Sequence, residues 1–153
     1  MDRAILEVLT ENARISNAEL AKRVGLTPGP CLRRVQKLES AGVLLGYTTQ
    51  INPESVGRSF EVGVSIDLNQ VDQHTVPEFE QTVGDFDEVL ELYRLFGTPD
   101  YYARVAVADL ASYERFLTTK LLTLPGVSLR HSAFPMKVIK SPRAHAATGD
   151  PAD

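Results

Sequence analysis

The sequence of 153 residues predicts an α+β protein with two modules, a bundle of three short helices followed by a module in which strands and helices alternate. Three observations indicate this. Apolar residues recur at helical spacing over residues 3–42, and a regular alternation of apolar and polar residues begins at Phe60. Basic residues are concentrated in the first part of the chain, whereas acidic residues dominate the second.

The composition excludes several classes of protein. It is 43% hydrophobic and 24% charged, which is typical of a globular domain rather than a collagen-like, coiled-coil or wholly disordered chain. No apolar run approaches the roughly 18 residues needed to cross a bilayer. The charged residues Asp2 and Arg3 stand where a signal peptide needs an apolar segment. The single cysteine, Cys31, has no partner for an internal disulfide, so we expect a reduced, cytoplasmic protein in which Cys31 is a small core residue.

The formal net charge of −4 is divided unevenly along the chain. Residues 1–58 carry eight Lys or Arg against six acids, a balance of +2, whereas residues 59–153 carry eight against fourteen, a balance of −6. Within residues 13–46, six bases face only Glu19 and Glu39. This asymmetry is typical of a basic module joined to an acidic one, and it leaves a nucleic-acid partner open for the first module.

Two short helices are expected at the start of the chain. Ile5 and Leu9 belong to one apolar stripe, which predicts a helix over about residues 3–12. Ser16 and Glu19 have the spacing of a capping box, in which the hydroxyl satisfies an early backbone N–H while the carboxylate reaches back. A second helix is therefore expected to begin there.

A short turn at Gly25 separates this second helix from a third. Thr27 is expected to cap the third helix, and Pro28 and Pro30 are tolerated in its first turn because those residues have no intrahelical N–H bond to lose. The helix is expected to run to Gly42. Two helices joined by so short a turn that contains glycine form a helix-turn-helix.

The third helix is predicted to have a cationic outer face. At about 100° per residue, Cys31 and Leu38 fall on the buried side while Arg33 and Lys37 fall nearly opposite them, with Arg34 on the flank. Such a face is either simply solvated or contacts DNA, where arginine bonds guanine bidentately and lysine suits phosphate. The candidate DNA-binding residues of this module are Ser16, Asn17, Thr27, Gly29, Pro30, Arg33, Arg34 and Lys37.

Residues 43–51 are rich in β-formers, and they predict a strand that serves both as a wing and as the connection to the second module. Asn52 and Pro53 end it. The expected domains are residues 1–52 for the helical module with its linker strand, 53–140 for the second module, and 141–153 for a disordered tail.

The second module predicts a β-α-β-β-α-β order. Its first strand, from Phe60, alternates with a period of two, and Thr75 and Glu78 form another capping box. The expected elements are a strand over 60–68, a helix over 75–84, strands over 89–96 and 101–107 joined by a turn at 97–100, a helix capped by Asp109, and a strand over 128–139. This order is the ferredoxin-like arrangement. Because its two helices cover only one sheet face, we expect the second module to self-associate through the other.

Four stretches carry a resemblance to a known family. They read NARISNAELA at 12–21, VGLTPGPCLRRV at 24–35, GTPDY at 97–101 and LPGV at 124–127. In this order they resemble the Lrp/AsnC family, and the match covers about residues 2–140. The resemblance implies a winged helix-turn-helix domain followed by a ferredoxin-like effector-binding and oligomerisation domain. Members usually carry several residues before the position of Asp2.

The resemblance also implies a function and partners. It implies a transcription regulator of amino-acid metabolism or transport that binds a double-stranded DNA operator, forms homodimers that assemble into octamers, and needs no cofactor and no membrane. The effector is a free amino acid, expected to be branched-chain or Met. Gly97 permits close backbone approach, loop N–H groups meet the α-carboxylate and Asp100 meets the ammonium group. The effector-binding candidates are Gly97, Thr98, Pro99, Asp100 and Tyr101.

Two other interpretations are weighed against this one. A Thr-Pro-Asp sequence after Gly97 is also ordinary turn chemistry. A protein that binds a metabolite or regulates an enzyme without DNA would use the ferredoxin-like half alone, but it would give no reason for the outward bases Arg33 and Lys37. Catalysis is not expected, because the histidines His74, His131 and His145 have no spacing that suggests a catalytic or metal site.

Overall fold

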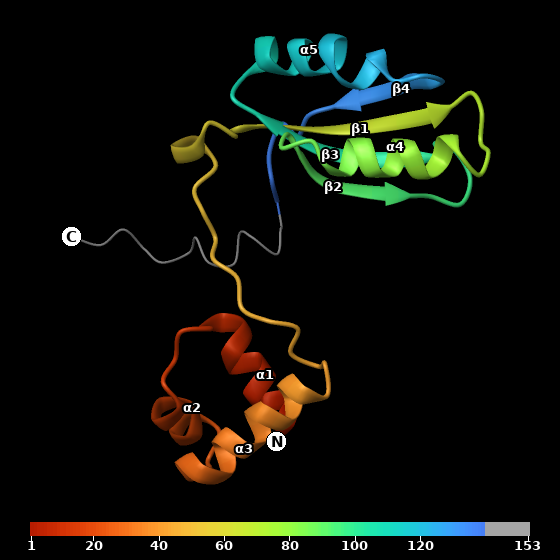
Figure 1. Ribbon diagram of the computed structural model, residues 1–153. Coiled ribbons are helices and arrows are strands. Elements are labelled where there is room, and N and C mark those ends of the chain that lie inside the picture. Colours follow the sequence, from red (N-terminus) through yellow and green to blue (C-terminus); the bar gives the residue numbers. More distant parts are fainter. Residues whose placement is uncertain (140–153) are drawn as a thin grey trace. The chain divides into compact units, whose positions relative to one another are not determined.

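The computed structural model describes residues 1–139, which form two compact units, Met1–Gln50 and Ile51–Ile139 (Figure 1). The division falls two residues before the boundary expected from the sequence. The expected tail at 141–153 lies outside the described residues. Each unit has its own hydrophobic core.

The first unit is a bundle of three helices, α1 (Asp2–Glu11), α2 (Asn17–Arg23) and α3 (Pro28–Ser40). All three agree with the sequence prediction to within about two residues at most ends. Its buried residues are Ile5, Leu9, Leu20, Ala21, Cys31 and Leu38. Cys31 is therefore a core residue, as expected, and burial raises the pKa of its thiol.

Capping holds the two helices of the helix-turn-helix in place. Ser16 Oγ accepts a hydrogen bond of 3.2 Å from Glu19 N, which confirms Ser16 as the N-cap of α2. Thr27 occupies the N-cap position of α3, but its side chain makes no capping hydrogen bond. Asn17 Nδ2 donates to the Pro28 carbonyl at 2.9 Å and so joins the start of α2 to the start of α3.

The expected strand over residues 43–51 is wrong. The segment has no strand geometry, and most of its apolar side chains are exposed, with Leu45 at 95% exposure. A strand is stable only when a neighbouring strand satisfies its N–H and C=O groups, and the described residues supply none for this segment. Leu44 alone packs against the core of the first unit.

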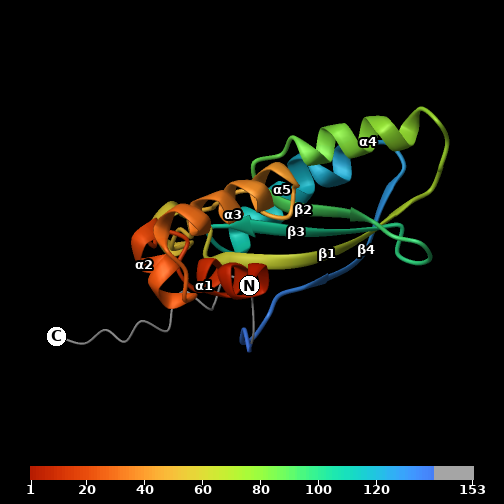
Figure 2. The same cartoon turned by 90° about the horizontal axis from the view of Figure 1, so that it is seen from below.

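The second unit is a four-stranded antiparallel sheet in the order β2-β3-β1-β4, with helices packed on one face (Figures 1 and 2). The strands are β1 (Phe60–Leu68), β2 (Val89–Arg94), β3 (Tyr101–Val107) and β4 (Val127–Ala133), and the helices are α4 (Thr75–Gly84) and α5 (Leu110–Thr119). Short 3₁₀ turns η1 (Glu54–Val56) and η2 (Leu121–Thr123) complete the unit. The ferredoxin-like order is confirmed, although β4 ends at Ala133 and not at 139.

The core of this unit follows the alternation seen in the sequence. Val62, Val64, Ile66 and Leu68 of β1 are buried against both helices. The helices contribute Val76, Phe79 and Val83 from α4 and Tyr113 and Phe116 from α5. No helix within residues 1–139 is long and apolar enough to span a membrane.

The two helices are capped by aspartates. Asp109 Oδ1 accepts from Ser112 N at 2.7 Å, which confirms it as the cap of α5 and lowers the pKa of Asp109. The expected cap of α4 is wrong, because Thr75 is already the first helical residue. His74 stands at the N-cap position and makes no side-chain capping bond, and Asp72, two residues earlier, accepts from the first N–H groups instead. Its carboxylate accepts from the backbone N–H groups of Thr75 and His74, both at 2.8 Å, and these bonds lower the pKa of Asp72.

The sheet face opposite the helices is charged and aromatic rather than apolar. Arg104 Nη2 donates to Glu91 Oε1 at 2.5 Å, and Arg104 Nη1 lies 3.9 Å from Glu61 Oε2. Tyr102 is stacked with Tyr93, with 6.5 Å between ring centroids. The second module is expected from its sequence to self-associate through an uncovered apolar sheet face. This face is not apolar, so that argument for self-association does not hold.

Candidate functional site

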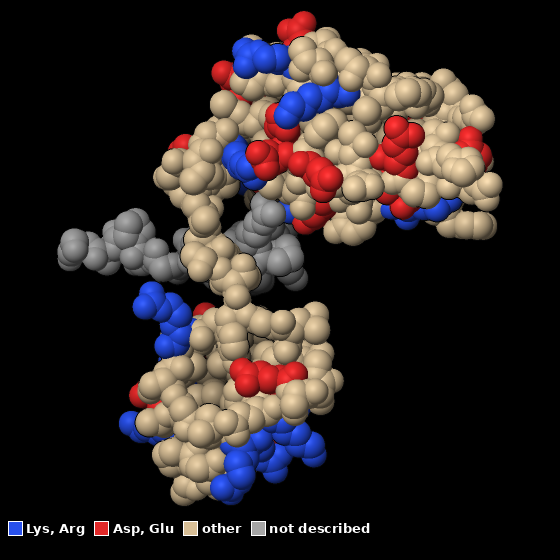
Figure 3. All heavy atoms as spheres, viewed as in Figure 1, with Lys and Arg blue, Asp and Glu red and all other residues tan. Residues whose placement is uncertain are grey.

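The outer face of α3 is cationic, as expected. Arg33 and Lys37 are exposed, and neither forms an ion pair with another residue in 1–139. A Cβ added at Gly29 would lie 3.8 Å from Arg33 Nη1, so this guanidinium extends back over the first turn of α3. Figure 3 shows basic side chains gathered around α2 and α3 at the lower end of the first unit.

Arg34 differs from the other two bases of α3. Its Nη1 donates to Asp2 Oδ1 at 2.7 Å, and both side chains remain about half exposed. This ion pair ties α3 to the start of α1. It also compensates part of the charge of Arg34, so Arg33 and Lys37 are the more available cations.

The remaining candidates lie at the N-terminal ends of α2 and α3. The Ser16 hydroxyl and the Asn17 amide are used in the internal bonds described above. Thr27 is exposed and makes no capping bond, so its hydroxyl is available to a ligand. Gly29 is exposed and Pro30 half-buried in the first turn.

The second group of candidates forms the turn between β2 and β3. Gly97 has a φ of +116°, a conformation that glycine adopts without strain, and Thr98 is exposed while Pro99 is half-buried. Leu95 N donates to the Asp100 carbonyl at 2.8 Å and closes the turn. Asp100 is half-buried, and its Oδ2 accepts from Leu68 N at 2.8 Å. Asp100 thus has a structural role at the end of β1, while no bond of its Oδ1 to another described residue is found.

Tyr101 lies in the core instead of on the surface of this turn. It is 1% exposed, its hydroxyl donates to Glu80 Oε1 at 2.8 Å, and its ring centroid lies 4.7 Å from that of Phe79. Burial and the Glu80 hydrogen bond raise the pKa of Tyr101 to about 12. The exposed apolar side chains near the turn are those of Leu95 and Phe96. Tyr101 anchors the end of the turn in the core, and its contact with an effector stays a prediction.

Sequence reasoning missed two residues beside this turn. Asp67 Oδ1 accepts from Asp100 N at 3.2 Å, and Asp67 Oδ2 accepts from Arg130 Nε at 2.6 Å. The Arg130 hydrogen bond lowers the pKa of Asp67, against the opposing effect of desolvation. In the sequence, Asp67 is one more outward polar residue of an alternating strand, and nothing there connects it with Arg130, 63 residues later.

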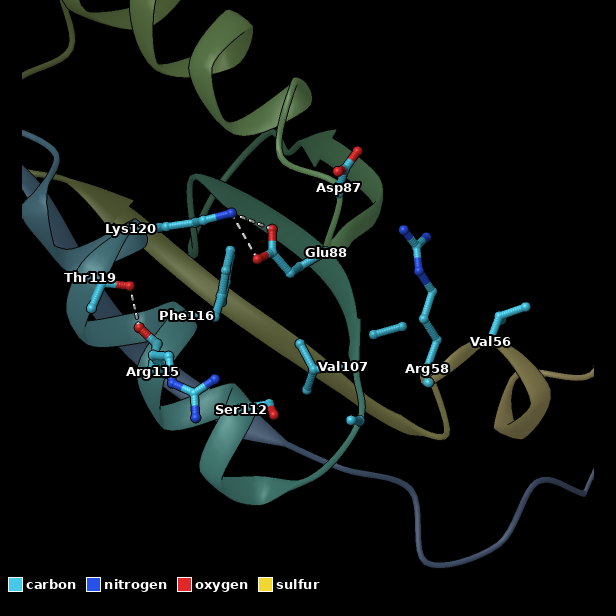
Figure 4. Close-up of a pocket in the computed structure, with 13 residues that line it drawn as sticks. Val56, Arg58, Asp87, Glu88, Val107, Ser112, Arg115, Phe116, Thr119 and Lys120 are labelled. Carbon is cyan, nitrogen blue, oxygen red and sulfur yellow. Dashed lines mark hydrogen bonds and ion pairs between the residues drawn. The ribbon is translucent and has the colours of Figure 1, made fainter.

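A pocket of about 310 Å³ lies elsewhere in the second unit, between η1, the start of β2 and α5 (Figure 4). Lys120 Nζ donates to both carboxylate oxygens of Glu88, at 2.8 and 2.9 Å. Burial opposes ionisation of Glu88, but the Lys120 hydrogen bond and the charges of Lys120 and Arg58 lower its pKa below the ordinary value. Arg115 and Phe116 of α5 also line the pocket. None of the DNA-binding or effector-binding residues predicted from the sequence lines this pocket.

The described residues hold no group of three or more His, Cys, Asp or Glu side chains placed to bind a metal. His74 and His131 are exposed. His145 lies outside the described residues.

Two family models match the chain in the order of its two units. A winged helix-turn-helix DNA-binding model matches residues 1–44, and an Lrp/AsnC ligand-binding domain model matches residues 61–145. The leucine-responsive regulatory proteins of Klebsiella pneumoniae and Escherichia coli K12 are both 39% identical to it over 140 residues. Each match covers 92% of this chain and 85% of the relative.

Solved structures of regulators are similar over the whole described fold. A Neisseria meningitidis transcriptional regulator in complex with L-Met has a TM-score of 0.86 at 35% identity, covering 92% of this chain and 90% of that one. An AsnC family regulator from Agrobacterium tumefaciens has a TM-score of 0.82 at 37% identity, with 92% and 91% covered. A feast or famine regulatory protein from Mycobacterium tuberculosis complexed with L-methionine has a TM-score of 0.80 at 31% identity, with 92% of each chain covered.

These matches decide between the interpretations left open by the sequence. The helix-turn-helix model covers the unit that carries Arg33 and Lys37, so the alternative of a DNA-independent metabolite-binding protein is not supported. The identity to regulators extends across both units. The chain belongs to the Lrp/AsnC family of DNA-binding transcription regulators.

Proposed function

We propose that this chain is a non-enzymatic regulator in the cytoplasm that binds a DNA operator through α3 and responds to a free amino acid held at the 97–101 turn. The observation that carries the DNA-binding half is the pair of exposed, unpaired bases on the outer face of α3, Arg33 and Lys37, in a chain whose net charge is −4. A helix-turn-helix protein places its second helix in the major groove. Arg33 then reads a guanine edge and Lys37 contacts a phosphate.

The regulator acts as an oligomer, with a homodimer as the unit that binds DNA and an octamer as the complete assembly. A single recognition helix contacts too few base pairs for useful specificity, whereas two copies related by a two-fold axis read both halves of a pseudo-palindrome. Light scattering on the full-length protein measures the assembly directly. A monomer at micromolar concentration would contradict this part of the proposal.

The effector site is the turn that contains Asp100. A zwitterionic amino acid needs an anion for its ammonium group and N–H donors for its carboxylate. Asp100 Oδ1 is not engaged by another described residue, and the turn supplies backbone N–H groups beside Gly97. The L-Met complexes of the regulators from N. meningitidis and M. tuberculosis support Met, and the similarity to leucine-responsive regulatory proteins supports a branched-chain amino acid. The target genes would then concern amino-acid metabolism or transport.

Calorimetry with Leu, Ile, Val, Met and a polar control amino acid tests this assignment on the full-length protein. Asp100→Asn should weaken binding at least about tenfold, because a charge-assisted bond to an ammonium group contributes roughly 1.5–3 kcal/mol. Arg115→Ala, in the pocket beside Glu88 and Lys120, serves as the competing variant. Binding that is lost in Arg115→Ala and kept in Asp100→Asn would move the effector to the pocket. If none of the amino acids binds, the effector assignment fails.

A further inference from the structure

The 97–100 turn is held by a chain of hydrogen bonds that starts two strands away. Arg130 Nε of β4 donates to Asp67 Oδ2 of β1 at 2.6 Å. Asp67 Oδ1 accepts from Asp100 N at 3.2 Å, and Asp100 Oδ2 accepts in turn from Leu68 N at 2.8 Å. Both ends of the Asp100 residue, its backbone N–H and its carboxylate, are thus fixed to the end of β1.

Arg130 lies on the same face of the sheet as Asp67 and directly beside a bulge in β4. In the pairing of β1 with β4, Ser65 lies opposite His131 and Ile66 lies opposite Leu129, so Arg130 is the extra residue. Leu129 packs against the core. A bulge re-aims a side chain locally, and bulges are enriched next to functional sites. Ser128 lies opposite Asp67 and Leu129 faces the core, so strand alternation directs Arg130 to the face of Asp67, and the bulge lies next to this contact.

The same contact sets the charge of the site. Asp67 and Asp100 are two carboxylates in hydrogen-bonded residues, and two uncompensated carboxylates so placed repel one another. Arg130 compensates Asp67 and leaves Asp100 as the single uncompensated anion of the group. One anion is what an amino-acid ammonium group needs.

We propose that Arg130 and Asp67 are positioning residues for the effector site, which hold the 97–100 turn in the form that receives an amino acid without contacting the ligand themselves. The proposal rests on the assignment of the effector to this turn. It makes the contact between β4 and β1 through Arg130 and Asp67 a determinant of effector affinity.

The test uses full-length Asp67→Asn, Arg130→Gln and the double variant. L-Met and L-Leu are the probes, and calorimetry is run at a temperature where every variant is fully folded. Each single variant should weaken binding roughly five- to tenfold, and the double variant should be no weaker than the poorer single one, because the two residues act as one unit. Arg130→Lys keeps the charge and should recover part of the affinity. The affinity of the effector-free protein for operator DNA should not change.

The matched control is Glu88→Gln, which breaks the Lys120–Glu88 ion pair of the same unit. The two ion pairs have similar exposure. The side chains of Lys120 and Glu88 are 41% and 25% exposed, and those of Arg130 and Asp67 are 53% and 25% exposed. The control should lower the unfolding temperature by a similar amount and leave the affinity for L-Met and L-Leu unchanged. If the control weakens effector binding as much as Arg130→Gln does, the proposal is overturned: the contact is only structural where Arg115→Ala still binds the amino acid, and the effector lies in the pocket where Arg115→Ala does not.

A second measurement separates this proposal from the effector assignment. Amide hydrogen exchange at Leu68 and Asp100 in the ligand-free protein reports opening of the turn, and it should be at least several-fold faster in Asp67→Asn and Arg130→Gln than in Glu88→Gln. If the wild-type protein binds no amino acid, the effector assignment fails and the positioning of the turn is still decided by exchange. If exchange is faster and effector affinity is unchanged, the positioning role in binding is refuted.

Discussion

Replacing the two unpaired bases of α3 should have two different effects on DNA binding. Arg33→Ala should lower operator affinity by roughly 1–3 kcal/mol for each recognition helix and relax base preference, since a bidentate contact to guanine is worth about that much. Lys37→Ala should weaken binding to operator and to scrambled DNA by similar factors, because a phosphate contact carries no sequence information. Arg3→Ala is the matched control, since this exposed base of α1 is already paired with Glu7 at 2.8 Å.

The size of the Lys37 effect follows from its surroundings. Lys37 has no ion pair with residues 1–139 to give up when it meets a phosphate. Each phosphate contact contributes about 0.9 to the slope of log K against log salt, so two copies on one operator should lose a slope of about 1.8 in Lys37→Ala. Arg34 must exchange its bond to Asp2 for a phosphate, and an exposed ion pair is worth about 0–1 kcal/mol. Arg34→Ala should therefore have the smaller effect.

Fluorescence anisotropy with operator and scrambled duplexes at four or five salt concentrations measures both quantities. Lys37 is not a phosphate contact if Lys37→Ala leaves the salt slope unchanged, or if Arg3→Ala changes the slope as much. Equal losses on both duplexes in Arg33→Ala would also remove this residue from base recognition and leave it as a phosphate contact.

Three further outcomes concern stability. Ser16→Ala should lower the free energy of unfolding by about 1 kcal/mol in urea denaturation, because Glu19 N loses its partner. Backbone hydrogen bonds lower the pKa values of Asp72 and Asp109 in the folded protein. The stability they contribute is therefore fully present above about pH 4 and is lost as the pH falls through the folded-state pKa. The urea midpoint should fall with acidification in that range, and it should fall less in Asp109→Asn. Tyr101→Phe should cost roughly 1–2 kcal/mol by thermal unfolding, because it removes the hydroxyl bonded to Glu80 while the ring still fills the core.

Much of the fold could be predicted from local pattern. The helical stripe with Ile5 and Leu9, the Ser16 cap and the period of two in β1 each depend on residues close in sequence, and all three are confirmed. The outward placement of Arg33 and Lys37 follows from the same periodicity. The ferredoxin-like arrangement of the sheet then follows from the β-α-β-β-α-β order of these elements along the chain.

Other features depended on contacts between distant residues. The β-forming composition of residues 43–51 could not make a strand, because strand stability lies in a neighbouring backbone that this segment does not have within the described chain. The turn residues 97–101 were found by their motif, but only the packing shows that Tyr101 is buried against Phe79 and bonded to Glu80.

The sequence by itself determined the two modules, their elements and the cationic face of α3, because these are set by periodicity and capping within a few residues. The tertiary structure alone decided how the 97–100 turn is held. Asp67 and Arg130 are 63 residues apart, and they meet because the register of β4 on β1 sets Ser128 opposite Asp67 and brings Arg130 to the same face. Strand register and bulge position are properties of the assembled sheet, since they depend on which hydrogen bonds the whole set of strands can satisfy together.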